Sequence, residues 1–347
     1  MTTTTAVMPA EWEKHSMIQL TWPHKDTNWR NMVPEITAVY VKLAQAISTY
    51  ENLLIVTPYP EATNSLLASS LPAECMSRIT LHKCMTNDTW ARDHAFLSIR
   101  DTSREQPITL LDFHFNGWGE KYPSALDDAI NRSVYAAGMV KGIYEDNSDF
   151  VLEGGSIESD GKGTIFTTSP CLLAPHRNQP LDRDGIEREL KKRLRAKRVM
   201  WVDHGHMMGD DTDGHIDTLV RIAPNDTLIY MGSGDDESDP HHADLRLMEE
   251  QLRTFRTLEG KPYRLVRLPL PAAVCYDGER LPATYANFLI LNGAVLIPTY
   301  AQPAKDEEAI ALIHSVFPDR EVATLDARQI IRQHGSVHCC AMQYYEN

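Results

Sequence analysis

Short apolar runs and segments of helical periodicity alternate along the whole chain. The runs are four to six residues long and rich in Val, Ile and Leu, which is typical of buried strands. The clearest strand candidates are Met17–Trp22, Leu53–Thr57, Ile108–Phe113, Val199–Val202, Thr227–Met231, Leu265–Leu268, Phe288–Leu291 and Val295–Pro298.

Three further segments place their apolar residues on one face of a helix. These residues are Ile36, Val39, Leu43 and Ile47, then Leu245, Met248, Leu252 and Phe255, and finally Ile310, Ile313 and Phe317. Because strands and helices alternate in similar clusters, the pattern predicts an α/β fold. We expect one domain over residues 1–347, with residues 1–7 as a flexible tail.

A fourth helix is predicted over Asp184–Arg198, where Asp184 and Glu187 have the spacing of a capping box. The basic run KKRLRAKR lies near its end. We interpret this run as a solvated helix face whose cations suit the helix dipole. A nucleic-acid patch is the weaker alternative.

Composition narrows the classes of partner. The 347 residues include 48 acidic and 34 basic ones, for a formal net charge of -14. A negative surface repels nucleic acid and anionic membranes, so we expect neither as a partner. The same charge is compatible with a small cationic substrate.

Cysteines and apolar stretches indicate a soluble cytoplasmic protein. The six cysteines are sparse and form no CxxC pair, which favours free thiols in a reducing compartment. The N-terminus has neither a basic start nor an apolar run, so no secretory signal is expected. The uncharged stretch Asn287–Ala304 is interrupted by Asn292, Gly293 and Pro298, and predicts two strands with a turn.

The segment GDDTDGHID, at Gly209–Asp217, is the most informative for chemistry. His215 and Asp217 are two residues apart before an apolar run, so a strand would place both on one face. An imidazole beside a carboxylate suits general acid–base catalysis near a bound cation. The alternative is a hydrogen-bonded loop with solvated acids.

A second segment, NDTWARDH at Asn87–His94, combines Trp90 with Asp93. A buried aspartate can hold a guanidinium through paired hydrogen bonds, and an indole face adds cation–π attraction of about 1 kcal/mol. An ordinary ion pair between Arg92 and Asp93, with Trp90 in the core, explains the same residues.

The third segment, VLEGGS, ends a predicted strand with Glu153 and two glycines. This arrangement can direct a carboxylate into a cleft, where Glu153 would orient a histidine or grip a substrate. A plain exit from a strand into a turn is the alternative.

The fourth segment, GSVHCC at Gly335–Cys340, carries two adjacent cysteines. On a strand, Cys339 and Cys340 face opposite sides, so only one enters a given cleft. A free cysteine is usually a small buried hydrophobe. A nucleophilic one needs a nearby cation, because a thiol with a pKa of about 8.5 is mostly protonated at neutral pH.

Two aromatic segments are candidate pocket walls. FNGWGEKY places Trp118 between glycines, and LPATYANF supplies Tyr285 and Asn287. Turn and core positions explain both equally well.

Together the motifs MPAEWEKH, NDTWARD, FNGWGEK, EGG, DDTDGHID, LPATYANF, VLIPTY and VHC resemble the agmatine deiminase family in order and spacing, from about Met8 to Gln343. The resemblance implies the pentein fold, an α/β-propeller with five ββαβ units around a pseudo-fivefold axis. It also implies hydrolysis of agmatine to N-carbamoylputrescine and ammonia, with neither metal nor cofactor. Self-association into a homo-oligomer is left open.

The resemblance also implies roles for individual residues. Cys339 rather than Cys340 is the nucleophile, Asp93 and Asp217 bind the guanidinium, and His215 transfers protons. Glu153 orients His215 or contacts the substrate, whereas Trp90 and Trp118 form walls around its alkyl chain.

This chain also departs from the family pattern. It has WARDHAF where many members have WMRDTGP, and QHGSVHCCAMQYY where many have GGGNIHCITQQ. Free arginine and peptidyl arginine are therefore alternative substrates.

Two other classes compete with a cysteine hydrolase. The crowded residues His204, His206, Asp210, Asp211, Asp213 and His215 could be ligands of a metal-dependent hydrolase. A non-catalytic binder of guanidines or polyamines is the other alternative, although all five expected functional positions hold chemically competent residues.

Overall fold

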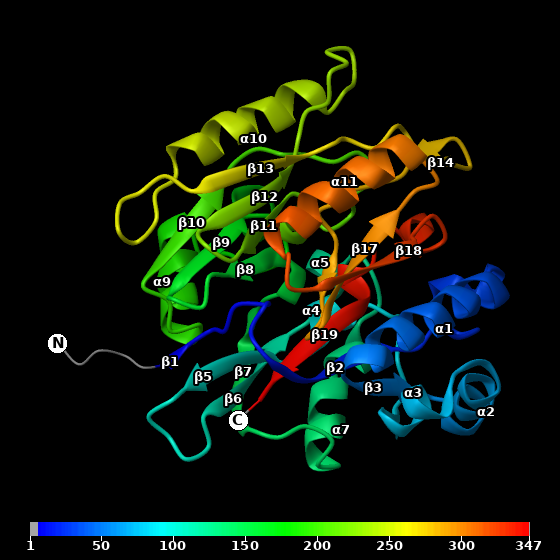
Figure 1. The fold of residues 1–347 in the computed structure, drawn as a ribbon. Helices are drawn as coiled ribbons and strands as arrows, with labels where there is room; N and C mark the ends of the chain where they lie inside the picture. The colour runs from blue at the N-terminus through cyan, green and yellow to red at the C-terminus, as the bar shows by residue number, and fades with distance from the viewer. Residues whose placement is uncertain (1–5, 347) are drawn as a thin grey trace.

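The computed structural model describes residues 6–346 and has a mixed α/β architecture. Strands fill the centre, whereas α1, α9, α10 and α11 lie at the periphery (Figure 1). The strands are β1 Ala6–Val7, β2 His15–Thr21, β3 Asn52–Thr57, β4 Ile79–Lys83, β5 Leu97–Asp101, β6 Ile108–His114, β7 Ile143–Val151, β8 Ile157–Ser159, β9 Thr164–Thr168, β10 Arg198–Val202, β11 Val220–Ala223, β12 Thr227–Met231, β13 Arg264–Leu268, β14 Cys275–Tyr276, β15 Glu279–Arg280, β16 Leu289–Ile290, β17 Ala294–Thr299, β18 Glu321–Asp326 and β19 Ala341–Tyr345. The helices are α1 Val33–Tyr50, α2 Pro60–Ser70, α3 Ala73–Ser77, α4 Ala91–His94, α5 Gly117–Glu120, α6 Ala125–Asp128, α7 Ile130–Ala136, α8 Ser169–Leu172, α9 Arg183–Arg193, α10 His242–Thr254 and α11 Pro303–Val316. Short 3₁₀ helices are η1 Asn28–Asn31, η2 Gly154–Ser156, η3 Ile216–Thr218, η4 Ile330–Gln333 and η5 His338–Cys340.

Five sheets in the described chain share one pattern of pairing. In each, a first strand pairs antiparallel with a second, which pairs parallel with a third. The strand triplets are β5–β6–β7, β8–β9–β10, β11–β12–β13, β16–β17–β18 and β19–β2–β3. A helix precedes each third strand: α7, α9, α10, α11 and α1 respectively. The described chain therefore contains five ββαβ units, one of which joins the C-terminal strand to the N-terminal region. The pseudo-fivefold axis remains a prediction.

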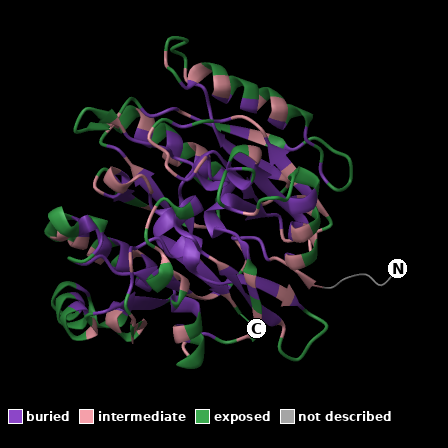
Figure 2. Ribbon diagram, turned by 180° about the vertical axis from the view of Figure 1, so that it is seen from behind, coloured by how far each residue is buried: buried purple, intermediate pink, exposed green. Residues whose placement is uncertain are grey.

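Apolar periodicity predicted the elements well. All eight predicted strands are present, with ends within two residues of the predicted ones. The predicted faces of α1 and α10 pack into the core, where buried residues concentrate (Figure 2). The uncharged stretch forms β16 and β17, joined by a turn at Asn292 and Gly293. Within residues 6–346, no helix is both long and apolar enough to span a membrane.

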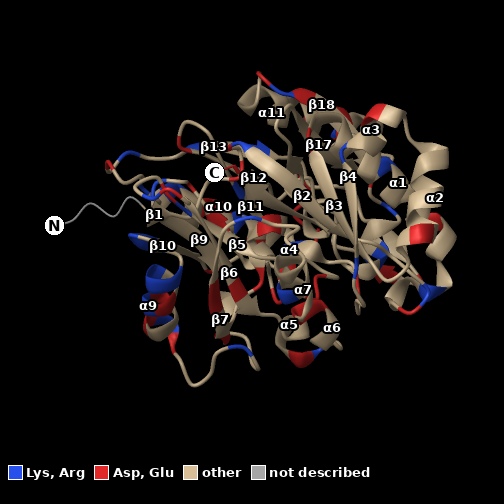
Figure 3. Cartoon of the chain, turned by 90° about the horizontal axis from the view of Figure 1, so that it is seen from below, with Lys and Arg blue, Asp and Glu red and all other residues tan. Residues whose placement is uncertain are grey.

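The predicted boundaries of α9 were wrong. The helix covers Arg183–Arg193, and its cap is Asp182, whose side chain accepts the Gly185 N–H at 2.8 Å. The contact between Asp182 and Gly185 spans three residues, as the predicted pair of Asp184 and Glu187 does, but it begins two residues earlier in the chain. Acidic and basic residues are intermixed along the ribbon of α9 (Figure 3). Arg193 pairs with Asp149 and Glu189, which favours the solvated-face interpretation.

The tail expected over residues 1–7 does not include Ala6 and Val7. Residues 1–5 lie outside the described part, whereas Ala6 and Val7 form β1. This strand pairs antiparallel with Asp101 and Arg100 of β5, so backbone hydrogen bonds anchor it to a sheet edge.

Candidate active site

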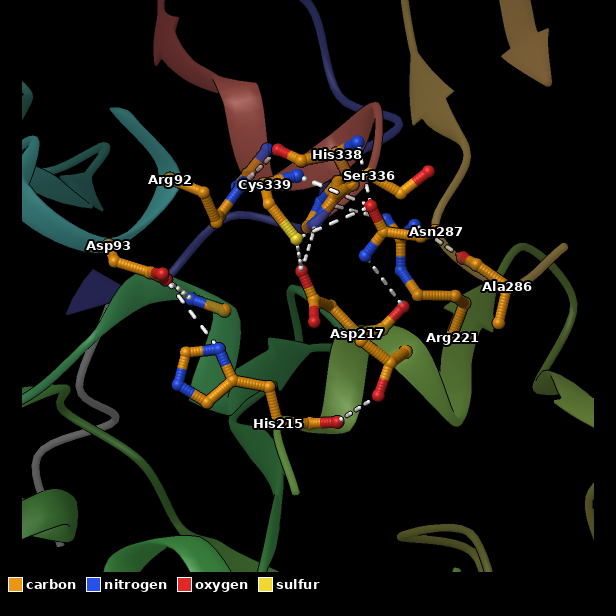
Figure 4. A network of polar contacts seen from close by, with 12 residues as sticks. Arg92, Asp93, His215, Asp217, Arg221, Ala286, Asn287, Ser336, His338 and Cys339 are labelled. Atoms are coloured by element: carbon orange, nitrogen blue, oxygen red, sulfur yellow. Dashed lines mark hydrogen bonds and ion pairs between the residues drawn. The ribbon is translucent and has the colours of Figure 1, made fainter. Parts of the chain in front are cut away.

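Equivalent positions of the five units supply the side chains of one site. The segment just before each unit's first strand carries Asp93, Glu153, Asp217, Asn287 or Cys339. Four of these segments are short helices, and α4 contacts both η2 and η5. Figure 4 shows that Asp93, Asp217, Asn287 and Cys339 converge with His215. The fold thus gathers residues that are far apart in sequence.

The Cys339 thiol is buried among oxygen acceptors. Its Sγ lies 3.4 Å from Asn287 Oδ1 and 3.6 Å from Asp217 Oδ2. Burial raises the pKa of the Cys339 thiol well above its ordinary value, and the charges of Asp217 and Asp93 add to this effect. In the free protein the thiol therefore stays protonated, and a cation near both carboxylates would favour the thiolate.

Asp217 uses its two oxygens differently. Oδ2 accepts a 2.7 Å hydrogen bond from His338 Nδ1 and lies near the Cys339 thiol. Oδ1 is buried and has no hydrogen-bond partner among the described residues. Burial opposes ionisation, but the hydrogen bond and charge of His338 keep the pKa of Asp217 below its ordinary value.

Asp93 is oriented by two N–H donors. The Trp118 indole Nε1 donates to Oδ2 at 2.9 Å, and the Gly155 backbone donates to Oδ1 at 3.0 Å. Burial raises the pKa of Asp93 to about 6, although His215 opposes the shift. Gly155 must lack a side chain here, because a Cβ would lie 2.6 Å from His215 Nδ1 and 2.8 Å from Asp93 Oδ1.

His215 faces the same space with both ring nitrogens unpartnered among the described residues. Its Nδ1 lies 3.7 Å from Asp93 Oδ1, and the side chain is only 1% exposed. Burial alone would lower the pKa of His215, but Asp93, Cys171 and Glu153 raise it well above its ordinary value. The imidazole is therefore protonated at neutral pH and can act as an acid.

Glu153 is completely buried and makes its ion pair with Arg177, whose Nε lies 3.1 Å from Oε1. Arg177 also binds Asp213 Oδ2 at 2.7 Å and the Thr212 carbonyl at 2.9 Å. Through Arg177, Glu153 anchors the loop that leads to His215. Because Glu153 also lies close to His215, its carboxylate favours the charged imidazole.

A narrow cavity opens beside these groups. Its walls include Trp90 and Trp118, as the aromatic motifs suggested, together with Asp88 and Asp211. Burial raises the pKa of Asp88 to about 7 and also raises that of Asp211. Among its described lining residues, none is Lys or Arg. The lining is Asn28, Asp88, Trp90, Asp93, Trp118, Tyr122, Asp211, Thr212, Gln333, Gly335 and Cys339.

Two predictions of local structure were wrong. His215 and Asp217 belong to the start of η3 rather than to a strand. Cys339 and Cys340 lie on η5, not on a strand. They nevertheless point differently, because Cys340 Sγ lies 3.3 Å from the Ser336 carbonyl, outside the substrate cavity. Short helical turns before the first strands of four of the five units contribute to this convergence.

Sequence reasoning missed several contributors. Arg177 and Glu11 gave no signal of their own, because each acts through partners distant in sequence. Asn287 was noted only as a pocket wall, yet its Oδ1 accepts from the His338 and Cys339 backbones at 3.0 and 3.3 Å. Its place just before β16 matches that of the other site residues, so an explicit repeat alignment could have identified it.

The proposed metal cluster does not assemble. Residues 6–346 contain two groups with the close spacing of ligand atoms that a metal needs, namely Glu153–Cys171–His215 and Glu11–Glu158–His338. Neither includes His204 or His206. His204 instead lies 3.4 Å from Asp244, away from the thiol site.

Comparisons with known proteins agree with this architecture. One solved structure that resembles this chain is a Pseudomonas aeruginosa dimethylarginine dimethylaminohydrolase. It is 12% identical and has a TM-score of 0.51 over 95% of this chain and all of the other, so this likeness concerns the fold alone. The fold is therefore a mixed α/β fold with neighbours in the pentein superfamily. Residues 7–344 match the sequence profile of the Porphyromonas-type peptidyl-arginine deiminases, and the chain belongs to this family.

Individual relatives of this chain are described as agmatine or arginine deiminases. Medicago truncatula agmatine deiminase is 31% identical over 97% of this chain and 95% of its own. A Porphyromonas gingivalis protein described provisionally as an arginine deiminase is 43% identical, with a TM-score of 0.91 and 98% coverage of both chains. A serine variant of C. jejuni agmatine deiminase, solved with substrate bound, is 31% identical and has a TM-score of 0.89 over 99% of this chain and 97% of the other.

Trp118→Phe is expected to shift the acid limb of the pH–kcat/KM profile upward. The resemblance to agmatine deiminases assigns guanidinium binding to Asp93, which must then be ionised, so activity is expected to rise with pH through the pKa of that carboxyl. Losing the indole N–H removes a bond to the charged form and raises this pKa further above 6. Trp90→Phe is the control, because Trp90 lines the same cavity without bonding Asp93. An unmoved acid limb in Trp118→Phe would contradict this role.

Proposed function

We propose that this protein hydrolyses agmatine to N-carbamoylputrescine and ammonia through a covalent intermediate on Cys339. The observation that carries the proposal is a set of buried polar atoms beside one thiol. Asp217 Oδ1 and both ring nitrogens of His215 have no hydrogen-bond partner among the described residues, although all are buried. Unpartnered buried groups are costly, so this arrangement fits a substrate that supplies several N–H donors and positive charge.

A guanidinium meets both requirements. It is planar and cationic, and its N–H groups match carboxylates on two sides. Asp93 and Asp217 would bind it, offsetting the negative charges that hold the Cys339 thiol protonated. Binding of the substrate therefore favours loss of the thiol proton to solvent, which leaves the thiolate beside the electrophilic carbon.

The first half of the reaction forms a thiouronium. The Cys339 thiolate bonds to the central guanidinium carbon, giving a neutral tetrahedral adduct. The His215 imidazolium then donates a proton to one nitrogen, and the C–N bond breaks to release ammonia. The alkyl-substituted thiouronium remains attached to the enzyme.

The second half consumes water. Neutral His215 accepts a proton from water, and the hydroxide adds to the thiouronium carbon. The C–S bond then breaks and the O–H proton passes to the departing sulfur, which leaves a urea group on the product and regenerates the Cys339 thiol. Glu153 supports both halves by favouring charged His215 and by anchoring its loop through Arg177.

The cavity favours an amine at the far end of the substrate. Trp90 and Trp118 would contact the alkyl chain, and Asp88 and Asp211 would meet the distal ammonium. That ammonium would stabilise the ionised forms of two carboxylates whose pKa values are otherwise raised. Free arginine would bring an additional carboxylate toward this acidic end.

Asp211→Asn tests the distal contact. Its kcat/KM for agmatine is expected to fall about tenfold, mainly through KM, because one charge-assisted contact is lost. With butylguanidine, which lacks the amine, wild type and variant should give similar values. An equal loss with both substrates would instead implicate Asp211 in the chemistry.

A direct comparison tests the substrate class. Ammonia release is measured for agmatine, free arginine and an arginyl peptide, and kcat/KM is expected to be highest for agmatine. A higher value for arginine or for the peptide would overturn the substrate proposed here while leaving guanidinium chemistry intact.

Three broader features accompany this proposal. We place the five units around a pseudo-fivefold axis, supported by their shared pairing pattern and by equivalent contributions to one site. We treat residues 1–347 as one catalytic domain, because its principal hydrophobic core includes residues from Ile18 to Ala341. Free thiols, the negative net charge and a small charged substrate support a cytoplasmic location.

A further inference from the structure

Behind the thiol, the His338 imidazole lies between two carboxylates, Glu11 from near the N-terminus and Asp217 from the middle of the chain. Its Nδ1 is 2.7 Å from Asp217 Oδ2, and its Nε2 is 2.9 Å from Glu11 Oε2. All three side chains are buried. Figure 4 shows His338 next to Cys339 and above Asp217. Glu11 comes from the MPAEWEKH motif, which the proposed reaction does not otherwise use.

Hydrogen-bond counting assigns the charge of this ring. Burial opposes ionisation of Glu11, but Arg221 and His338 hold the pKa of Glu11 well below its ordinary value, and that of Asp217 is also lowered. Both groups are therefore carboxylates, which only accept hydrogen bonds. A neutral imidazole has one N–H, and its bare Nε2 could accept from Arg221 Nη2 at 3.1 Å but would then face the Glu11 carboxylate at 2.9 Å without a proton between them. Only the doubly protonated ring donates to both carboxylates.

Arg221 reinforces the arrangement. Its Nη2 pairs with Glu11 and lies 3.1 Å from His338 Nε2, so the ring and the guanidinium share Glu11 as acceptor. Gln343 donates to the other Glu11 oxygen at 2.8 Å. Glu11 is therefore fixed on both oxygens.

The His338 bond also determines how Asp217 meets the substrate. His338 occupies Oδ2, the oxygen near the Cys339 thiol, and this leaves Oδ1 as the unpartnered oxygen. Without the bond, the carboxylate could rotate and exchange the two oxygens. The positive ring also offsets the Asp217 charge that disfavours the thiolate.

We propose that Glu11 and His338 are positioning residues, in which Glu11 keeps His338 protonated and His338 fixes Asp217 and supplies positive charge beside Cys339. The relevance to turnover rests on the proposed deiminase function. The test of the charge itself needs no substrate. The charged or titratable groups around His338 are Glu11, Glu158, Arg92, Asp217, Arg221 and Cys339.

Glu11→Gln tests the proposal, with alkylation of Cys339 by iodoacetamide followed by tandem mass spectrometry across pH. The neutral amide of this variant cannot stabilise a cation as a carboxylate does, so His338 loses its proton more readily. The midpoint of alkylation is then expected to rise by about one pH unit, because a nearby positive charge is lost. The kcat/KM for agmatine should also fall about tenfold.

Glu158→Gln is the matched control. Glu158 lies in the same buried cluster, but it binds Arg221 and the Ile222 backbone rather than hydrogen-bonding His338. Both variants should lower the melting temperature, whereas only Glu11→Gln should raise the alkylation midpoint. If Glu11→Gln does not fold, His338→Gln is measured in its place, with the same upward shift expected.

The sign of the shift decides the outcome. If Glu11 acted only as a nearby negative charge, its removal would lower the midpoint. A lowered or unchanged midpoint would overturn the positioning role. Lack of agmatine turnover in the wild type would contradict the proposed function but would leave the alkylation result interpretable.

Discussion

Cys339→Ser is expected to lower kcat for agmatine by about 10³-fold or more, since a serine hydroxyl is far less acidic than a thiol and a poorer nucleophile. Asp93 and Asp217 remain in place, so the variant should still bind agmatine, as isothermal titration calorimetry can measure. Ammonia release under saturating substrate gives kcat.

Cys340→Ser provides a control of the same chemical change one residue away. Cys340 Sγ lies near the Ser336 carbonyl, and Cys340 is absent from the lining of the substrate cavity. This variant should keep kcat within about threefold of wild type, since it removes no contact with the reacting atoms. Loss of activity in Cys340→Ser with retention in Cys339→Ser would reverse the assignment of the nucleophile.

His215→Asn is expected to reduce kcat by about 10²–10⁴-fold, the usual contribution of a positioned general acid and base. Asparagine keeps a polar side chain in the cleft but can neither protonate departing ammonia nor accept a proton from water. The loss should appear mainly in kcat, because binding of the guanidinium depends on Asp93 and Asp217.

His314→Asn, on the exposed side of α11, is the control for this substitution. Single-turnover kinetics would separate the two steps that His215 serves. Equal rates for wild type and His215→Asn in both ammonia release and product formation would exclude the imidazole from the reaction.

Apolar periodicity predicted most of the fold because burial controls the strands and long helices. The α1 face at Ile36, Val39, Leu43 and Ile47 is the clearest case, since packing and sequence pattern agree. Helix ends were less predictable. Asp182 and Asp184 have similar capping ability, and only the path of the chain selects Asp182.

The site was predicted in its residue types but not in its local geometry. Motif order identified Cys339, His215, Asp93 and Asp217, and the structure brings these four side chains together. Their 3₁₀ and helical turns were not predicted, because such short segments carry no periodicity of their own.

Residues that contact the site residues from behind were harder still to predict. Arg177 reaches Glu153 and Asp213, and Glu11 reaches His338 across almost the whole chain. Such pairs depend on how the five units assemble, so a local sequence pattern cannot reveal them. Asp88 and Asp211 likewise could not be recognised as neighbours from the sequence, because only the folded structure places both in the wall of one cavity.

Covalent trapping tests the nucleophile most directly. Wild-type protein is mixed with saturating agmatine, quenched in acid during turnover and analysed by tandem mass spectrometry of the peptide that contains Cys339 and Cys340. We predict a mass increase equal to agmatine less ammonia, located on Cys339. An adduct on Cys340, or continued turnover in a Cys339→Ser variant at the wild-type rate, would contradict attack by the Cys339 thiol on the guanidinium.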